Sequence, residues 1–301
     1  MKLLITGASG MLGHSLMRLA VERHEVVGIY RSFPVSMRGG KSLALDLADE
    51  DRVKKQVAAL KPEAIVHTAA MTDVEECERD PVRANRVNFQ ATKNLARLGG
   101  GLGIPFVYIS TDYVFDGKKG SYVETDPPNP VNVYGETKLL GEEAVRSCCP
   151  RSLVIRTSIF GFNIQPKTGF VEYVMESLAK GEVITRFLDQ FSTPIYTRDL
   201  GRFILELLDR GSTGLFHVGG GERISRYDFA VKVAETFCLS PAMIRPAPFR
   251  HLEGSAQRPR DSSLCSEKVE SHLKMRLPSA KEGLERLKQD LAVHQKSEGD
   301  I

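Results

Sequence analysis

The sequence is poor in the residues that build disulfide scaffolds, metal sites and membrane spans. It has no tryptophan and five cysteines, two of which, Cys148 and Cys149, are adjacent. An odd number of cysteines with this spacing fits neither a disulfide framework nor a zinc site. The first apolar run, Met1–Thr6, meets Gly7 at once and is too short for a signal peptide or a membrane span. We therefore expect a cytoplasmic protein with reduced thiols, no metal ligand set and no membrane partner.

A strong charge imbalance is absent as well. The net charge is +3 at pH 7 and no basic run stands out, so nothing predicts a nucleic-acid partner. A hydrophobic content of 42% and a charged content of 26% are typical of a globular chain. The length of 301 residues is sufficient for one large domain with a smaller lobe.

Short apolar runs alternate with helical patterns through the first half of the chain. One helical pattern starts at Asp80-Pro81 and is expected to stop at the glycine run 99–101, and another is expected to open at Pro130. This alternation predicts an α/β fold with a doubly wound parallel sheet, the Rossmann architecture. The expected strands cover residues 3–6, 24–30, 42–45, 64–67, 105–110 and 152–156.

The second half of the chain is less regular. A helix at 197–210 and a strand at 214–218 predict a return to the sheet. A further helix is expected at 225–237, with Ser225 as its N-cap. The segment 240–261 is expected to be a loop, and the polar chain from about residue 282 is expected to fray.

These patterns suggest two parts that interleave along the chain. We assign residues 1–160, with return segments at about 186–220, to a dinucleotide-binding Rossmann domain. We assign residues at about 161–185 and 221–301 to a smaller substrate-binding lobe.

A glycine-rich turn lies between the first expected strand and the helix after it. Glycines allow a tight turn and let a pyrophosphate approach a helix N-terminus, where free N–H groups favour negative charge. A plain turn would also use glycines, but a position after a strand and before an amphipathic helix favours a dinucleotide. The candidate cofactor-binding residues in this turn are Gly7, Gly10, Met11, Leu12 and Gly13.

The ends of the next strands predict which dinucleotide is bound. An acidic residue at the end of the second strand would bond the ribose 2′-hydroxyl of NAD, whereas this chain has Arg31, which suits the 2′-phosphate of NADP. We therefore favour NADPH, with NADH as the alternative cofactor. Asp46 ends the third strand, where a carboxylate would bond the adenine amine. The remaining cofactor candidates follow the third and fourth strands and are Leu47, Ala69, Ala70 and Met71.

Tyr134 and Lys138 form the candidate reaction pair, because four-residue spacing puts both on one helix face. A free phenol titrates near pH ~10, and a positive charge beside it would lower that pKa, so the pair suits proton transfer in a reduction. Lys138 would also hold the nicotinamide ribose. Ser110 or Thr111 would hold a substrate carbonyl at the strand end, and we select Thr111. His67 is expected to be a packed histidine.

Together these segments resemble an extended short-chain dehydrogenase/reductase, and more narrowly the dTDP-4-dehydrorhamnose reductase family, up to about residue 280. The matching segments are GASGMLGH (7–14), STDYVFDG (110–117), ETDPPNPVNVYGETKLLGEEAV (124–145), RTSIFG (156–161), DQFSTPIYTRDL (189–200), GLFHVGGGERISRYDFA (214–230) and RPRDSSL (258–264).

That resemblance implies reduction of dTDP-4-dehydro-6-deoxy-L-mannose, a 4-keto-6-deoxy sugar on a nucleotide carrier, to dTDP-L-rhamnose. The hydride would come from the nicotinamide and the proton from Tyr134. Thr111 and Asp112 match the substrate contacts of the family. The charge of Arg258 suits the pyrophosphate of such a substrate, although a surface loop would also carry such a residue.

One position departs from the family pattern, and other functions stay open. Many members have an aromatic residue after Arg-Thr-Ser, near the sugar, whereas this chain has Ile159, so the sequence does not select the sugar. The family resembles the β subunit of methionine adenosyltransferase, which would make the chain an NADP-binding regulatory subunit. A nucleotide-sugar epimerase or dehydratase is the third hypothesis. A homodimer is compatible with every one of these functions.

Overall fold

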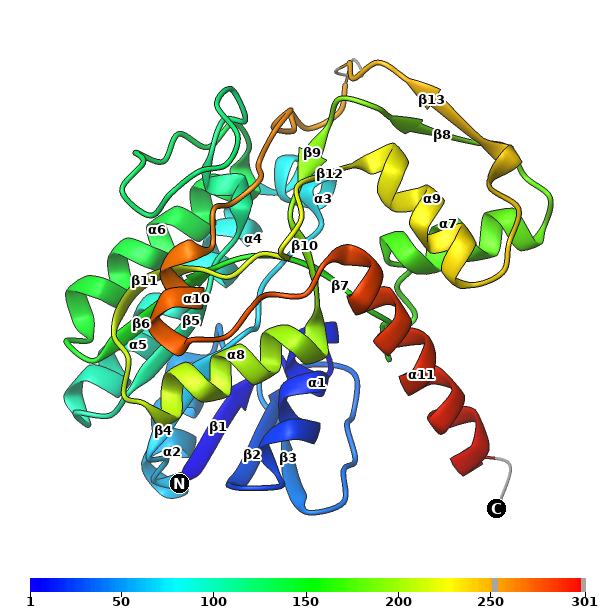
Figure 1. Cartoon of the computed structure of the whole chain (residues 1–301). Coiled ribbons are helices and arrows are strands. Elements are labelled where there is room, and N and C mark those ends of the chain that lie inside the picture. The colour runs from blue at the N-terminus through cyan, green and yellow to red at the C-terminus, as the bar shows by residue number, and fades with distance from the viewer. Residues whose placement is uncertain (251–253, 299–301) are drawn as a thin grey trace.

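The computed structural model describes residues 1–250 and 254–298, and a seven-stranded sheet forms its centre (Figure 1). The strand order is β11-β6-β5-β4-β1-β2-β3, and every neighbouring pair is parallel. The chain winds outward from β1 in both directions, which confirms the doubly wound prediction. These strands are β1 (Lys2–Thr6), β2 (Glu25–Tyr30), β3 (Gly40–Ala44), β4 (Ala64–His67), β5 (Phe106–Ile109), β6 (Ser152–Arg156) and β11 (Gly214–His217).

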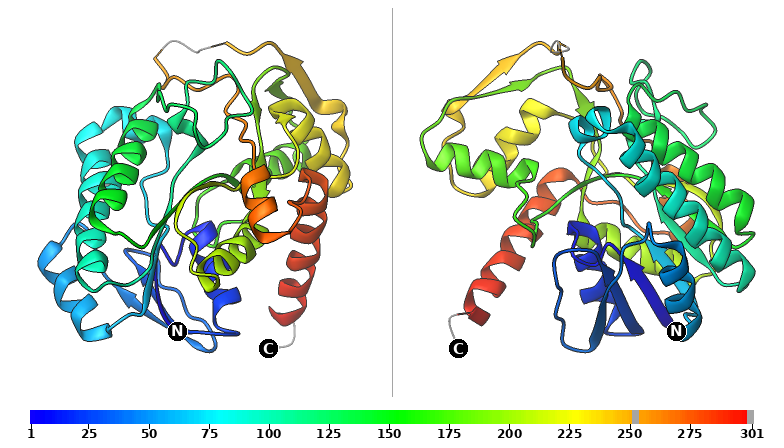
Figure 2. Two further views of the ribbon diagram at one scale, coloured as in Figure 1. Left: turned by 60° about the vertical axis from the view of Figure 1, so that its left-hand side comes forward. Right: turned by 180° about the vertical axis from the view of Figure 1, so that it is seen from behind.

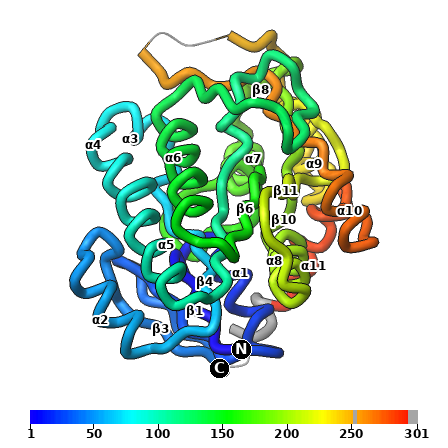
Figure 3. The backbone as a smooth tube through the Cα atoms, turned by 90° about the vertical axis from the view of Figure 1, so that its left-hand side faces the viewer, coloured from blue at the N-terminus to red at the C-terminus, as the bar shows by residue number. Residues whose placement is uncertain are grey.

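Helices cover both faces of this sheet, and Figure 3 shows the sheet between the two layers. The five helices concerned are α1 (Met11–Ala20), α2 (Glu50–Leu60), α5 (Ala91–Gly101), α6 (Val133–Cys148) and α8 (Thr197–Asp209). On one face, α1 and α8 bury Leu16 and Ile204. On the other face, α2 and α5 bury Val57 and Leu95, and α6 packs beside them. Burial of these apolar stripes drives the layering.

The helical stretch that begins at Asp80-Pro81 ends within the glycine run at 99–101, as predicted. The chain runs through α3 (Val74–Arg79), α4 (Pro81–Ala84) and a π-helical stretch (Asn85–Gln90) into α5, which ends at Gly101. A Cβ at Gly100 would lie 1.9 Å from the Cys148 carbonyl oxygen, and one at Gly99 would lie 3.0 Å from the Phe106 ring. Gly99 and Gly100 are therefore also needed for close packing.

The helix that carries the reaction pair begins later than expected. Its first residue is Val133 and not Pro130. The side chain of Asn132 accepts a hydrogen bond from the Gly135 N–H at 2.8 Å. Asparagine is a preferred N-cap because it satisfies one of the free N–H groups of the first turn, and this cap sets the boundary.

A second core lies beside the sheet domain (Figure 2). Its buried residues come from helices and short strands and include Val174, Phe229 and Leu284 on the helices. Ser225 caps α9 by accepting the Asp228 N–H at 2.9 Å, as predicted. The elements of this part and its connections are β7 (Ser158–Phe160), α7 (Phe170–Ala179), β8 (Ile184–Phe187), β9 (Phe191–Ser192), β10 (Pro194–Tyr196), β12 (Ile224–Ser225), α9 (Arg226–Thr236), β13 (Ile244–Ala247), α10 (Glu267–Leu273) and α11 (Ala280–Glu298).

Two expectations about the C-terminal region are wrong. The segment 240–261 contains β13, which pairs with β8 because buried Ile244 fits beside Ile184; residues 251–253 of that segment lie outside the described part. The chain does not fray from residue 282, because α11 buries Leu284 and Leu287 in the second core. The last three residues, 299–301, are also outside the described part.

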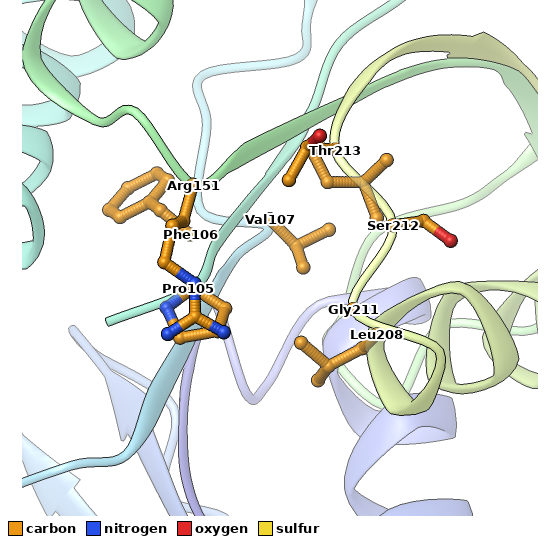
Figure 4. Close-up of a pocket in the computed structure, with 9 residues that line it drawn as sticks. Pro105, Phe106, Val107, Arg151, Leu208, Gly211, Ser212 and Thr213 are labelled. Atoms are coloured by element: carbon orange, nitrogen blue, oxygen red, sulfur yellow. The ribbon is translucent and has the colours of Figure 1, made fainter. Parts of the chain in front are cut away.

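A small cavity of about 10 Å³ lies at the amino-terminal edge of the sheet (Figure 4). This volume is close to that of one water molecule, and ligands of such folds bind at the opposite edge. Its lining residues are Pro105, Phe106, Val107, Arg151, Leu153, Leu208, Gly211, Ser212 and Thr213. Within residues 1–250 and 254–298, no helix is both long and apolar enough to cross a bilayer.

Candidate active site

The turn between β1 and α1 is built so that only glycine fits at two of its positions. Gly7 has a φ of +68°, and a Cβ there would lie 2.8 Å from the Ala69 backbone nitrogen. A Cβ at Gly13 would lie 2.1 Å from the Gly7 carbonyl oxygen. No side chain caps the N-terminus of α1 at Gly10, so the N–H groups of Met11 and the next residues remain available. This arrangement fits the pyrophosphate of a dinucleotide.

The loop after β4 lies against this turn and is held by one buried side chain. Asn88 accepts the Met71 N–H at 2.8 Å and donates to the Met71 carbonyl at 3.0 Å. It also donates to the Thr137 hydroxyl of α6 at 3.1 Å. Ala69 and Ala70, beside Met71, are half-buried at the same edge. Asn88 lies in the π-helical stretch and was not predicted from the sequence. The signal that could have identified it is a polar residue on a helix face that is otherwise buried.

The predicted adenosine-side residues lie at the ends of β2 and β3. Arg31 is exposed, its Nε donates to Ser32 Oγ at 3.4 Å, and it has no acidic partner among the described residues. Asp46 is also exposed and accepts the Ala48 N–H at 2.9 Å, while Leu47 is half-buried. A free guanidinium at this strand end suits the extra phosphate of NADP.

The structure brings two of the predicted catalytic residues into contact. The Thr111 hydroxyl lies close enough to the Tyr134 phenol to act on its pKa. Thr111 donates to Asp112 Oδ1 at 3.1 Å, and Ser262 donates to Asp112 Oδ2 at 2.5 Å. Thr111, Asp112 and Ser262 therefore form a hydrogen-bonded chain beside Tyr134. Ser262 was missed because it is distant in sequence, within the segment that also carries Arg258.

Burial sets the protonation states in this chain of hydroxyl and carboxyl groups. Loss of water raises the pKa of Tyr134, and the nearby Thr111 hydroxyl opposes this rise. Burial also raises the pKa of Asp112 to about 6, although Ser262 and the charge of Arg226 oppose the shift. At neutral pH the phenol is therefore protonated and able to donate.

Lys138 does not lower the pKa of Tyr134 in this structure, contrary to the expectation from their spacing. Its Nζ donates to the Ile109 carbonyl at 2.6 Å and lies 4.1 Å from the centre of the Tyr108 ring. Burial lowers the pKa of Lys138 to about 7, and Glu142 opposes this shift. The ammonium thus points into the protein, below the phenol, and its charge is satisfied by a backbone carbonyl.

A buried ion pair supports the floor of the site. Glu142 accepts from Ser110 Oγ at 2.6 Å and from Arg156 at 2.9 and 2.8 Å. Through these bonds Glu142 on α6 is connected to β6 and to the end of β5. These are the elements that carry Tyr134, Lys138 and Thr111. Because the Ser110 hydroxyl is already bonded to Glu142, Thr111 is the hydroxyl that faces Tyr134.

His67 is a packed histidine, as expected. Its ring nitrogens bond the hydroxyl groups of Thr6 at 2.7 Å and Thr92 at 2.9 Å. Burial, reinforced by the charge of Lys138, lowers its pKa to about 3. The ring is therefore neutral and tied between β1 and α5, where it cannot reach a substrate at Tyr134.

Arg258 lies beside the helix that carries Tyr134, with its charge paired. Its guanidinium donates to Glu75 at 2.6 Å, and Glu75 also accepts the Ala256 N–H at 3.0 Å. Asn132, the N-cap of α6, donates to the Gln257 carbonyl at 2.8 Å. A hollow of about 480 Å³ opens here, a volume in the range of ligand sites. Its lining residues are Glu78, Val131, Gly254, Ser255, Ala256 and Gln257.

A loop before α7 reaches across to the cofactor side. Gln165 donates to Ser9 of the glycine turn at 2.8 Å, and Lys167 donates to Thr72 after β4 at 3.1 Å. Both ends of this loop are tied to Glu172 through Asn163 and the Gly169 N–H. We call residues 163–169 the strap. No local sequence pattern predicts the strap, because its contacts join segments that are far apart in the chain.

Known proteins resemble the chain along most of its length. A family model described as the RmlD substrate binding domain matches residues 1–293. The chain is 35% identical over 289 residues to the probable low-salt glycan biosynthesis reductase Agl14 of Haloferax volcanii, covering 93% of this chain and 95% of that protein. It is 32% identical over 276 residues to methionine adenosyltransferase 2 subunit beta of Danio rerio, covering 88% and 83% respectively.

Solved structures match as well. A hypothetical dTDP-4-dehydrorhamnose reductase from Sulfolobus tokodaii is 42% identical, with a TM-score of 0.82, and the match covers 93% of this chain and 97% of that one. The dTDP-4-dehydrorhamnose reductase of Bacillus anthracis, in complex with NADP, is 28% identical, with a TM-score of 0.85 and coverages of 96% and 99%.

Proposed function

The chain belongs to the dTDP-4-dehydrorhamnose reductase family of extended short-chain dehydrogenases/reductases, and on that premise we propose that it reduces a nucleotide-activated 4-keto-6-deoxy sugar with NADPH. Membership of this family makes it an NADP-dependent oxidoreductase. The proposed substrate is dTDP-4-dehydro-6-deoxy-L-mannose and the proposed product is dTDP-L-rhamnose.

The observation that carries the proposal is the proximity of the Thr111 hydroxyl to the Tyr134 phenol at the carboxyl ends of the strands. The glycine turn after β1 and the loop after β4 lie along the same edge of the sheet. There Gly7, Gly10, Met11, Leu12 and Gly13 would hold the pyrophosphate of the cofactor, which supplies a hydride when bound. Outer contacts would come from Arg31, Asp46, Leu47, Ala69, Ala70 and Met71.

The residues of the chain would position the sugar and supply the proton. Thr111 and Tyr134 would both donate to the oxygen of the keto group. Tyr134 would give its proton to that oxygen as the carbonyl carbon gains a hydride, which yields an alcohol, and water would then reprotonate the phenolate. Lys138 would bind the nicotinamide ribose and keep a positive charge below the phenolate. Asp112 would contact the sugar.

The choice of sugar is the least constrained part of the proposal. Ile159 stands where many family members have an aromatic residue, and its side chain is 40% exposed. An aliphatic side chain offers less area and no ring face to a sugar, so a relaxed preference among 4-keto-6-deoxy sugars is expected. Competition between related keto sugars in one assay would measure it.

The direct test is NADPH oxidation by the purified protein with the keto sugar. We expect one NADPH consumed for each sugar reduced. Tyr134→Phe is expected to lower kcat by about 10²–10⁴-fold, because the proton donor is removed, while NADPH binding is retained. Tyr113→Phe, which removes the neighbouring phenol, is the matched control and is expected to stay within about tenfold of wild type. Unchanged turnover in Tyr134→Phe would assign the proton to another group.

A second function is favoured by the 32% identity to methionine adenosyltransferase 2 subunit beta. In that case the chain would bind NADP and a partner enzyme without turnover. Wild-type protein that is inert toward keto sugars, binds NADP and co-purifies with a synthetase would support this function. An epimerase would instead retain its cofactor through purification and show no net loss of NADPH.

A further inference from the structure

Two arginines beside the second core share one aromatic ring. The guanidinium carbons of Arg186 and Arg226 lie 5.6 and 5.3 Å from the centre of the Phe170 ring. Arg186 also lies 4.5 Å from the Tyr173 ring. Neither guanidinium has an ion-pair partner in the described part of the chain, and Arg186 Nε is buried without a hydrogen-bond partner.

Other arginines around this region are neutralised. Arg223 pairs with Asp261 at 2.5 Å, Arg258 with Glu75 at 2.6 Å and Arg260 with Asp189 at 2.6 Å. A further pair, Arg286 with Asp199, ties α11 to α8. Arg186 and Arg226 differ from these arginines, because they are half-buried and form no ion pair among the described residues. Burial of an unpaired cation is costly, so such charges fit a ligand that supplies the missing anion.

The two arginines lie where two helices begin. Phe170 is the first residue of α7 and Arg226 is the first residue of α9, and the stacked rings of Phe170 and Phe229 hold these helices together at 5.3 Å. In Figure 1, α9 leaves β12 beside the sheet domain and runs away from it, so its N-terminus is the end nearer the sheet.

Arg226 is also linked to the reaction centre. Its charge acts on buried Asp112, which accepts a hydrogen bond from Thr111 beside Tyr134. A ligand held by Arg226 would therefore lie within reach of a sugar whose keto group contacts Tyr134. The glycine turn, which would bind the phosphates of the cofactor, belongs to the sheet domain and not to α7 or α9.

We propose that Arg186 and Arg226 form a binding site for the diphosphate of the nucleotide sugar. Guanidinium groups match phosphate oxygens with pairs of parallel hydrogen bonds, and Phe170 holds the guanidinium planes in place. Arg258 would be a weaker partner, because Glu75 already neutralises it. The inference rests on the proposed function, since it assigns a binding role within the same substrate site.

The test measures binding of dTDP and, separately, of NADPH by titration calorimetry at fixed salt. Arg186→Gln and Arg226→Gln are each expected to weaken dTDP binding about tenfold and to leave NADPH binding within about twofold. Arg226→Lys, which keeps the charge, is expected to recover part of the loss. Arg52→Gln, at an exposed arginine on α2, is the matched control and is expected to bind both ligands like wild type.

The possible results distinguish an error about the arginine site from an error about the proposed reaction. Unchanged dTDP binding in the folded double variant, checked by its melting temperature, would overturn the site even if the keto sugar is reduced. Equal weakening of dTDP and NADPH would assign the arginines to the cofactor instead and would also overturn it. Wild-type protein that binds no nucleoside diphosphate would do the same. Arginine-dependent dTDP binding without any sugar reduction would support the site and reject the reductase.

Discussion

The cofactor side and the substrate side of the site are built in different ways. On the cofactor side, backbone meets backbone, because a Cβ at Gly13 would lie 2.1 Å from the Gly7 carbonyl. On the substrate side, side chains from separated segments meet: Ser262 donates to Asp112, and Arg258 donates to Glu75. The cofactor side depends on glycines, which have no Cβ, and the substrate side depends on where charged side chains lie.

This difference indicates which amino-acid substitutions each side of the site tolerates. Close backbone packing leaves no freedom for a larger side chain, since native interiors are already dense. Charged side chains can be exchanged for other polar groups at a cost that depends on whether a partner is left unpaired. We therefore expect substitutions on the cofactor side to impair binding through steric clashes. Substitutions on the substrate side are expected to act by leaving a charged group unpaired.

The largest expected effect comes from Glu142→Gln, below the reaction centre. This change leaves Arg156 as a buried cation without a counter-charge, which is expected to cost about 3–5 kcal/mol of unfolding free energy. Urea unfolding would measure it. Glu143→Gln, the exposed neighbour, is the control and is expected to unfold like wild type. Identical midpoints for the two variants would show that the ion pair does not stabilise the floor.

Next in size is Gly13→Val on the cofactor side. The new side chain would collide with the Gly7 carbonyl and displace the start of α1, so NADPH affinity is expected to fall by about 100-fold or more. Fluorescence titration of NADPH would measure this loss. Gly101→Ala serves as a control because a Cβ there meets nothing within 4 Å. Wild-type affinity in Gly13→Val would contradict the close contact.

A smaller effect is expected from pH through His67. Its folded pKa, about 3, is below its ordinary value of 6.5, so the unfolded chain binds more protons between these two values. Stability from this group is therefore lost as the pH falls through 6.5 toward 3, on the order of 2 kcal/mol between pH 7 and pH 5.

The raised pKa of Asp112 acts in the opposite direction, so only a comparison of variants isolates the histidine. Urea midpoints at pH 7 and pH 5 are expected to differ less in His67→Gln than in wild type. His272→Gln, at an exposed histidine, is expected to keep the wild-type difference. An unchanged difference in His67→Gln would reject the buried neutral ring as the cause.

The smallest expected effect concerns the strap, which joins the two sides. Lys167→Ala removes the contact with Thr72 and is expected to weaken NADPH binding about threefold, because the contact is exposed. Fluorescence titration at low and high salt would measure it. Lys180→Ala, at an exposed lysine beyond α7, is the control. Equal affinities in the two variants would leave the strap without a role on the cofactor side.

The cofactor side could be predicted from the sequence because its determinants are local. A strand, a glycine turn and a helix follow one another from β1 to α1, and each is set by residues within a few positions. The same is true of Tyr134 and Lys138, which share a face of α6. The helix end in the glycine run was predicted correctly. The helix start at Pro130 was wrong because a side-chain cap, not local propensity, decided it.

The substrate side could be predicted only in part. Thr111 was selected for its place at a strand end and Asp112 by resemblance, but Ser262, Asn88 and the strap carry no local pattern. The direction of Lys138 was also mistaken, because spacing on a helix does not say which backbone carbonyl will accept the ammonium. The pairing of Arg258 with Glu75 depends on α3 lying beside a segment far along the chain.

The sequence by itself determined the winding of the sheet, the glycine turn and the phenol and ammonium on one helix face, because these depend on periodicity and on neighbours in the chain. Only the tertiary structure decided which hydroxyl faces Tyr134, where Lys138 directs its charge, and which arginines remain unpaired. Such features depend on contacts between distant segments, and burial and pairing of polar groups are properties of those contacts.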